Sequence, residues 1–182
     1  IAMVFLGACV FSALFNFQAG FAAARGLDYT VFYVTYTVVV IGLRFAASGF
    51  VGRQPRDRAT IGLLVMMTAA VGLLLVTGAN PLYALAAALL GAGYGLVYPL
   101  IQAQAVADSP RHRPTLVLTI FSVSYFLGIF GFPLVAGHLI VRWGYGALLA
   151  VLLALAAAET GLALVRAARS RRAPLLSDRG VS

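Results

Sequence analysis

The sequence is poor in charged residues, in acidic residues above all, and in cysteine. Only 10% of its 182 residues are charged, whereas about a quarter are charged in a typical soluble domain. Five acidic residues stand against 13 basic ones, all of them arginine, so the formal net charge is +8. The single cysteine, Cys9, excludes an internal disulfide and a CxxC metal or redox pair. A water-soluble fold and thiol-based redox chemistry are therefore not expected.

The arginines lie in short clusters between long apolar runs and do not follow one face. A nucleic-acid-binding protein gathers its basic residues into a patch or stripe. Clusters between apolar runs are instead typical of loops on one side of a membrane. We therefore expect a lipid bilayer as a partner of this chain, and no nucleic acid.

Apolar residues make up 62% of the chain and form long runs. A bilayer core about 30 Å thick needs about 20 helical residues to cross it, and a helix satisfies its own backbone there. We predict an all-α membrane protein with a six-helix half-bundle over residues 1–167 and an arginine-rich tail over 168–182. The predicted spans are approximately 1–24, 30–52, 59–78, 82–106, 114–141 and 145–166.

Arginine counts predict which side of the membrane each loop faces, because positively charged loops stay in the cytoplasm. The loops after the second and fourth spans and the tail from Arg166 onward carry ten arginines, whereas the opposite loops carry only Arg25 and Arg142. Both ends of the chain, the C-terminus included, are therefore expected in the cytoplasm, with the spans in the inner membrane. The chain begins at Ile1, inside a span, which indicates that an upstream part is missing.

Polar side chains follow narrow stripes on the first, second and fourth predicted spans, each within a wedge of about 100° or less. Helices that turn such stripes inward can enclose a polar pathway. An isolated polar residue in a membrane helix more often makes a hydrogen bond to another helix, and this alternative stays open for each one. The candidate substrate-cavity residues are Asn16, Tyr33, Tyr36, Tyr94, Tyr98 and Gln102.

Two charged residues lie within predicted spans, Arg44 and Glu159. A charge at the membrane centre costs about 2.5 to 3.5 kcal/mol on insertion scales, so such groups usually face protein or water. Both are candidates for coupling or gating. The alternatives are that Arg44 reaches the lipid headgroups and that Glu159 pairs with a nearby arginine in a helix that faces lipid.

Glycine and proline recur where helices would have to approach closely or bend. Small residues let two helices come together, and a proline inside a helix removes one backbone hydrogen bond. For the glycines of the fourth span, a packing seam and the wall of a wetted cavity are both open. The candidate kink and packing residues are Gly91, Gly95, Pro99, Gly128, Gly131 and Pro133.

The topology and three motifs together resemble the C-terminal half of a major facilitator superfamily carrier. The motifs are "SGFVGRQPRDR" after the second span, "GAGYGLVYP" in the fourth and "GIFGFPLVAGHLI" in the fifth. The first is similar to the family pattern G-x-x-x-D-R-x-G-R-R, with Arg53 and Arg56 at basic positions, Gly52 in place of the aspartate and Pro55 in place of a glycine. Arg53 and Arg56 thereby join the gating candidates.

The resemblance implies two three-helix inverted repeats that form one half of a twelve-helix fold. It also implies that the first and fourth spans line the cavity, that the second and fifth meet a missing N-terminal six-helix half, and that the third and sixth face lipid. The glycine and proline pattern of the fifth span resembles one that marks exporters in this family when it occurs in the fifth helix of the first half, whereas here it lies in the second half.

The resulting hypothesis is a secondary transporter that moves a small organic solute by alternating access, through proton-coupled efflux. The group that carries the proton lies in the absent half or is Glu159. A non-transporting six-helix sensor or assembly module stays open as an alternative. An enzyme, a metal site and a cofactor are not expected, because the sequence has neither HExxH nor GxSxG and no second carboxylate near Glu159.

Overall fold

The computed structural model of the protein describes residues 1–46, 56–109 and 113–177. These residues form five α-helices, each long and apolar enough to cross a membrane. The prediction of an all-α membrane fold is confirmed to this extent. The helices are α1 (Ala2–Arg25), α2 (Tyr29–Ala46), α3 (Arg56–Val76), α4 (Asn80–Ala107) and α5 (Pro114–Ser177).

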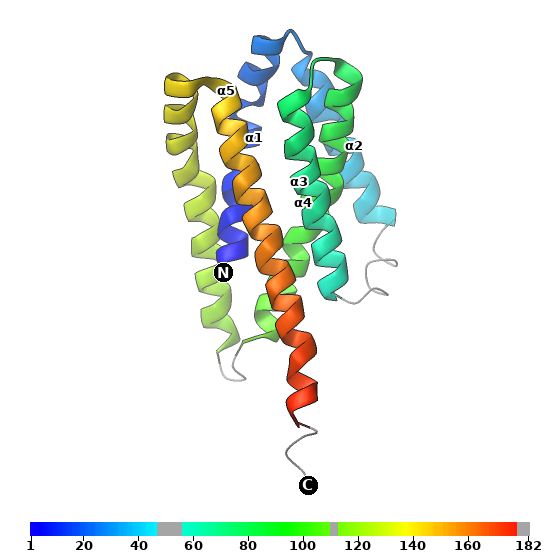
Figure 1. Cartoon of the computed structure of the whole chain (residues 1–182), viewed down its shortest axis with the longest axis vertical. Helices are drawn as coiled ribbons and strands as arrows, with labels where there is room; N and C mark the ends of the chain where they lie inside the picture. Colours follow the sequence, from blue (N-terminus) through cyan, green and yellow to red (C-terminus); the bar gives the residue numbers. More distant parts are fainter. Residues whose placement is uncertain (47–55, 110–112, 178–182) are drawn as a thin grey trace.

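Helix α5 is broken at Gly144, whose backbone angles of φ 78° and ψ 177° are not helical. Glycine has no Cβ, so it adopts a positive φ at little steric cost. The two arms of α5 on either side of this break run in opposite directions (Figure 1). Five helices are therefore found in the described residues where six were expected, because the turn predicted between the last two spans is a break inside one helix. The second arm continues to Ser177, so the predicted arginine-rich tail begins within it.

The helices run up and down between two ends of the molecule (Figure 1). One end holds Arg25, at the end of α1, and Arg142, beside the Gly144 break. The other holds the start of α3, where Arg56 and Arg58 lie, and the end of the second arm of α5. We call the latter the arginine-rich end. More of the described arginines lie at this end than at the other, as the count of arginines in the loops predicts.

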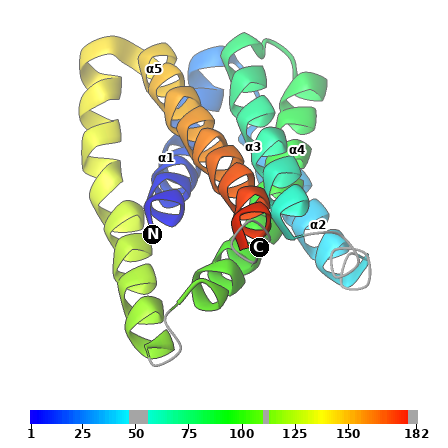
Figure 2. The ribbon, with the colours of Figure 1, turned by 60° about the horizontal axis from the view of Figure 1, so that its bottom comes forward.

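Helix α4 packs against α2 and α3, and α5 packs against α1 and α3. Figure 2 shows the second arm of α5 lying between α1 and α3. Close approach of α3 and α4 depends on Gly93, because a Cβ added there would lie 2.6 Å from the Leu63 carbonyl oxygen. In contrast, α2 is barely covered, and Phe32 is its only buried residue among those described. Helix α2 thus packs against α4 on one face and is largely uncovered elsewhere.

Candidate functional site

Three of the predicted cavity residues meet in an aromatic cluster between α1, α2 and α4, formed by Phe11, Phe15, Tyr33, Tyr36 and Tyr94. The Phe11 ring stacks on Tyr94 with 4.1 Å between centroids. Phe15 lies edge-on to Tyr36 at 4.7 Å and to Tyr33 at 5.8 Å. Offset and edge-on geometries of this kind are favoured by the charge distribution of the rings. The cluster joins the second and fourth predicted stripes through two phenylalanines of α1.

Tyr98 lies one turn after Tyr94 on α4, and its ring contacts aromatic rings of α5. Its ring centroid lies 4.8 Å from that of Tyr125 and 5.4 Å from that of Phe121. The Tyr98 side chain is only partly buried. Aromatic rings therefore extend from α2 across α4 to the first arm of α5.

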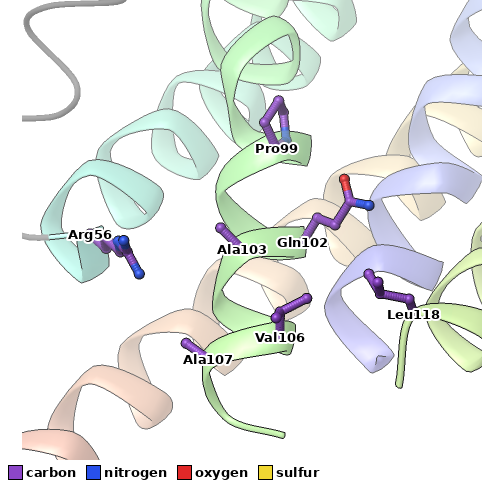
Figure 3. Close-up of a pocket in the computed structure, with 7 residues that line it drawn as sticks. All are labelled: Arg56, Pro99, Gln102, Ala103, Val106, Ala107 and Leu118. Carbon is purple, nitrogen blue, oxygen red and sulfur yellow. The ribbon is translucent and has the colours of Figure 1, made fainter. Parts of the chain in front are cut away.

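Gln102, a further turn along α4, lines a cavity of about 510 Å³ near the arginine-rich end (Figure 3). Arg56 of α3 and Leu118 of α5 form its other sides, and Pro99 lies one turn above Gln102. We call this space the α4 cavity. Its volume is in the range of small-molecule sites, about 300 to 1,000 Å³. The Gln102 amide both donates and accepts hydrogen bonds, and Arg56 supplies positive charge.

Asn16 lies outside both groups. Its side-chain nitrogen donates to the Ser12 carbonyl oxygen at 2.8 Å, one turn back on α1. The Ser12 hydroxyl donates to the Ile129 carbonyl oxygen on α5. The polar stripe of α1 is therefore engaged with its own helix and with α5, while Asn16 itself is exposed.

The glycines named from the sequence differ in what they contact. A Cβ at Gly91 would lie 3.0 Å from the Tyr36 carbonyl oxygen, and one at Gly95 would lie 3.0 Å from a methyl group of Val40. Both glycines therefore face α2 at close range. On α5, a Cβ at Gly128 would lie 2.7 Å from the Ala8 Cβ on α1.

The two remaining packing candidates, Gly131 and Pro133, also lie on the first arm of α5. A Cβ at Gly131 would meet only Leu127 of its own helix within 4 Å. Pro133 is partly buried in the first arm of α5. The close-packing face predicted for the fifth span is thus centred on Gly128.

The four coupling or gating candidates have separate surroundings. Arg44 is exposed in the last turn of α2. Arg53 lies outside the described residues, and Arg56 is exposed at the edge of the α4 cavity. Glu159, in the second arm of α5, is buried with 1% of its surface exposed.

The arginine partner and the lipid-facing position expected for Glu159 are both wrong. Its carboxyl group lies against Gly7 of α1, and one of its oxygens has no hydrogen-bond partner in the part of the chain that the structure describes. Arg166, the nearest arginine along α5, instead binds Asp57 of α3 at 2.5 Å and Asp108 after α4 at 2.8 Å. This ion network is not predictable from sequence spacing, because Arg166 lies 58 and 109 residues from its two partners.

Phe11 and Phe15 belong to the aromatic cluster but are not among the cavity residues predicted from the sequence. Phenylalanines are common in any membrane span, and periodicity alone does not distinguish a ring that faces a cavity from one that faces lipid. Their spacing of four residues, one helical turn, was the only available indication.

A comparison with curated proteins found no match. A comparison with protein families matched the model of the Major Facilitator Superfamily over residues 1–133. The matched region covers α1 to α4 and part of the first arm of α5, including the aromatic cluster and the α4 cavity. With helices suited to a bilayer and a match over more than half of its length, the chain belongs to the Major Facilitator Superfamily of membrane transporters.

Proposed function

We propose that this chain is the C-terminal half of a secondary active transporter that moves a small organic solute by alternating access. The observation that carries the proposal is the row Tyr94, Tyr98 and Gln102 on α4, at a spacing of one helical turn. This row connects the buried aromatic cluster to the α4 cavity at the arginine-rich end. A solute could exchange aromatic contacts and hydrogen bonds along it without leaving α4.

Uncovered apolar faces support a missing N-terminal half. On α2, Val34, Val38 and Ile41 are each more than half exposed, and so are Phe130 and Leu134 on the first arm of α5. In a membrane such faces meet lipid or other helices. A second six-helix half over α2 and this arm would close the aromatic cluster from the open side. The two arms of α5 would then count as separate passes, giving six spans in two inverted three-helix repeats.

The chemistry of the row suits a solute with a flat apolar part and at least one hydrogen-bonding group. Aromatic faces bind the former, and the Gln102 amide binds the latter. Arg56 at the edge of the cavity favours an acceptor or a negative charge on the solute. We assign the arginine-rich end to the cytoplasm of an inner membrane, and transport to proton-coupled efflux. Asn16 is proposed as a further substrate contact, and Arg44 and Arg53 as residues that take part in coupling or gating.

Transport assays on variants of the row test this function. Inverted membrane vesicles that contain the complete carrier would be energised with a proton gradient and offered a panel of aromatic dyes. Tyr98→Ala and Gln102→Ala should each lower the transport rate by about tenfold, which corresponds to about 1.4 kcal/mol of lost interaction. Leu85→Ala, on the same helix and half exposed, is the matched control and should keep the rate.

If the chain is instead a non-transporting sensor or assembly module, the two substitutions should leave dye movement unchanged. Dye movement that is equal in the parent protein and both variants, at equal protein levels in the membrane, would favour that module. The same conclusion would follow if the parent protein moved none of the solutes.

A further inference from the structure

The carboxyl group of Glu159 is inserted between helices at a depth where charge is costly. It lies seven residues before Arg166, about 10 Å along the helix from the arginine-rich end. A Cβ added to Gly7 of α1 would lie 2.8 and 3.0 Å from its two oxygens, so the carboxyl group occupies the space that the missing side chain leaves there. This close approach places Glu159 inside the bundle, against the α1 backbone.

A second buried polar group lies on the same small cavity. Glu159 Oε2 and the Tyr94 hydroxyl are both buried without a hydrogen-bond partner among the described residues. Both side chains line one cavity, bordered also by Gly7 and Tyr98, with a volume of about 10 Å³ open to the centre of a water molecule. That is about the space of a single water. Buried polar groups are normally paired, so two unpaired ones on one cavity indicate a ligand.

No described cation neutralises the Glu159 carboxyl group. Arg166 is held by Asp57 and Asp108 at the arginine-rich end. Helix α3, which packs against the same arm, carries charge only in its first three residues. A buried carboxyl group without a cation avoids the cost of an unpaired charge by holding a proton.

The other titratable groups near Glu159 are neutral thiol and phenol groups. Cys9 on α1 and Tyr94 on α4 both interact electrostatically with it. Tyr98 borders the cavity from α4. Tyr125 on α5 and Tyr36 on α2 act on Tyr94, and Tyr125 does so without a well-formed hydrogen bond. None of these groups supplies a counter-charge, which leaves the proton as the ligand that fits.

We propose that Glu159 and Tyr94 form a proton-binding site of this carrier. With the proton bound, the neutral carboxyl group packs against Gly7 and shares the one water with the Tyr94 hydroxyl. With the proton released to water, the carboxylate accepts a hydrogen bond from Tyr94 and draws further water into the space between α1, α4 and α5. Tyr98 borders this site, and the next residue of α4, Pro99, borders the α4 cavity, so the two spaces lie beside consecutive residues of one helix. The role in coupling rests on the transport function proposed above, whereas proton binding itself can be measured without a substrate.

Labelling with a lipid-soluble carbodiimide tests the site directly. A protonated carboxyl group adds across the reagent to an O-acylisourea, which rearranges to a stable N-acylurea with no atom lost. The complete carrier in lipid vesicles would be labelled over a range of pH, and the Glu159 peptide would be quantified by mass spectrometry. Labelling should fall by about tenfold for each pH unit above a single midpoint, as for one titrating group. Labelling of exposed Asp28 in the same samples is the reference for a carboxyl group in contact with water.

Three variants sharpen the result. Glu159→Gln should abolish the label on that peptide. Tyr94→Phe keeps the carboxyl group and removes only the hydroxyl, so it should shift the midpoint even if Glu159→Gln does not fold. Leu85→Ala, distant from the cavity on the exposed side of α4, should leave the midpoint unchanged.

Labelling of Glu159 that follows the pH profile of Asp28, or an unchanged midpoint in Tyr94→Phe, would overturn the site. Protection by sodium at constant pH would also overturn it, in favour of a metal-cation site. These readouts do not involve transport, so their failure is distinct from failure of the dye assay.

Discussion

At the scale of single residues, the identity of a few glycines decides how closely the helices approach. Gly7, Gly93 and Gly128 each face the backbone or a side chain of another helix within about 3 Å of where a Cβ would stand. Helices in a membrane gain little from the hydrophobic effect between themselves, so close van der Waals packing carries their association. These glycines therefore stabilise the bundle because the absence of a side chain lets the helices pack closely.

Gly93→Ala should destabilise the protein. The added methyl group would lie 2.6 Å from the Leu63 carbonyl oxygen and 3.0 Å from the Met67 nitrogen, and backbone atoms cannot rotate away. Overpacking of this kind costs typically about 1 to 3 kcal/mol. Thermal unfolding of the purified protein in detergent would show a lower midpoint.

Gly62→Ala on α3 is the matched control, because nothing lies within 4 Å of its Cβ position. The same methyl group in an open helical position should be neutral or stabilising by up to about 1 kcal/mol. An equal loss of stability in both variants would contradict the role of close approach at Gly93.

At the scale of helices, the end of α3 depends on an arginine from α1. The last carbonyl groups of a helix have no partner within it and carry partial negative charge. Arg25 donates to the carbonyl oxygens of Leu74 at 3.2 Å, Leu75 at 3.1 Å and Thr77 at 2.6 Å. In the sequence Arg25 counts only as one charge in a loop, whereas in the structure it caps the C-terminal end of α3 and links it to α1.

Arg25→Gln should lower the free energy of unfolding by about 1.5 to 3 kcal/mol, the range for hydrogen bonds that involve a charged group. Urea or thermal unfolding in detergent would measure the change. Arg142→Gln, at the same end of the molecule and exposed, should have a much smaller effect. Equal effects of the two substitutions would show that only net charge matters there.

At the scale of the whole molecule, the Arg166 network joins three helices at the arginine-rich end. Arg166 binds Asp108 through two nitrogens, with N–O distances of 3.0, 3.1 and 2.8 Å, and it also contacts Asp57. Its side chain is 31% exposed and that of Asp108 is 59% exposed. Exposed ion pairs contribute little, so the network orients the helix ends more than it stabilises them.

A double-mutant cycle with Arg166→Gln and Asp108→Asn should give a coupling energy of about 0.2 to 1 kcal/mol. The coupling should shrink at high salt, because added ions screen partly exposed charges. Arg169→Gln, on the exposed surface of the same arm, is the control and should show no coupling to Asp108. Coupling that is large and independent of salt would mean that the pair is shielded from water.

Sequence alone determined the membrane class, the positions of the helices and the clustering of arginines at one end. Predicted spans 1–24 and 82–106 correspond closely to Ala2–Arg25 and Asn80–Ala107. These are local properties, because apolar length and the turn residues that end a run are read along the chain. The family resemblance rested on equally local motifs and is confirmed by the match over residues 1–133.

Tertiary structure decided which residues meet, because contacts between membrane helices depend on how their axes pack and not on spacing along the chain. It separated Asn16 from Tyr36 and Tyr94, although all three belong to stripes of similar appearance. It also placed the Glu159 carboxyl group against Gly7 of α1, whereas the sequence had suggested an arginine partner in a lipid-facing helix. Periodicity indicates that a face is polar or small, but only the neighbouring helix determines whether that face meets lipid, water or another side chain.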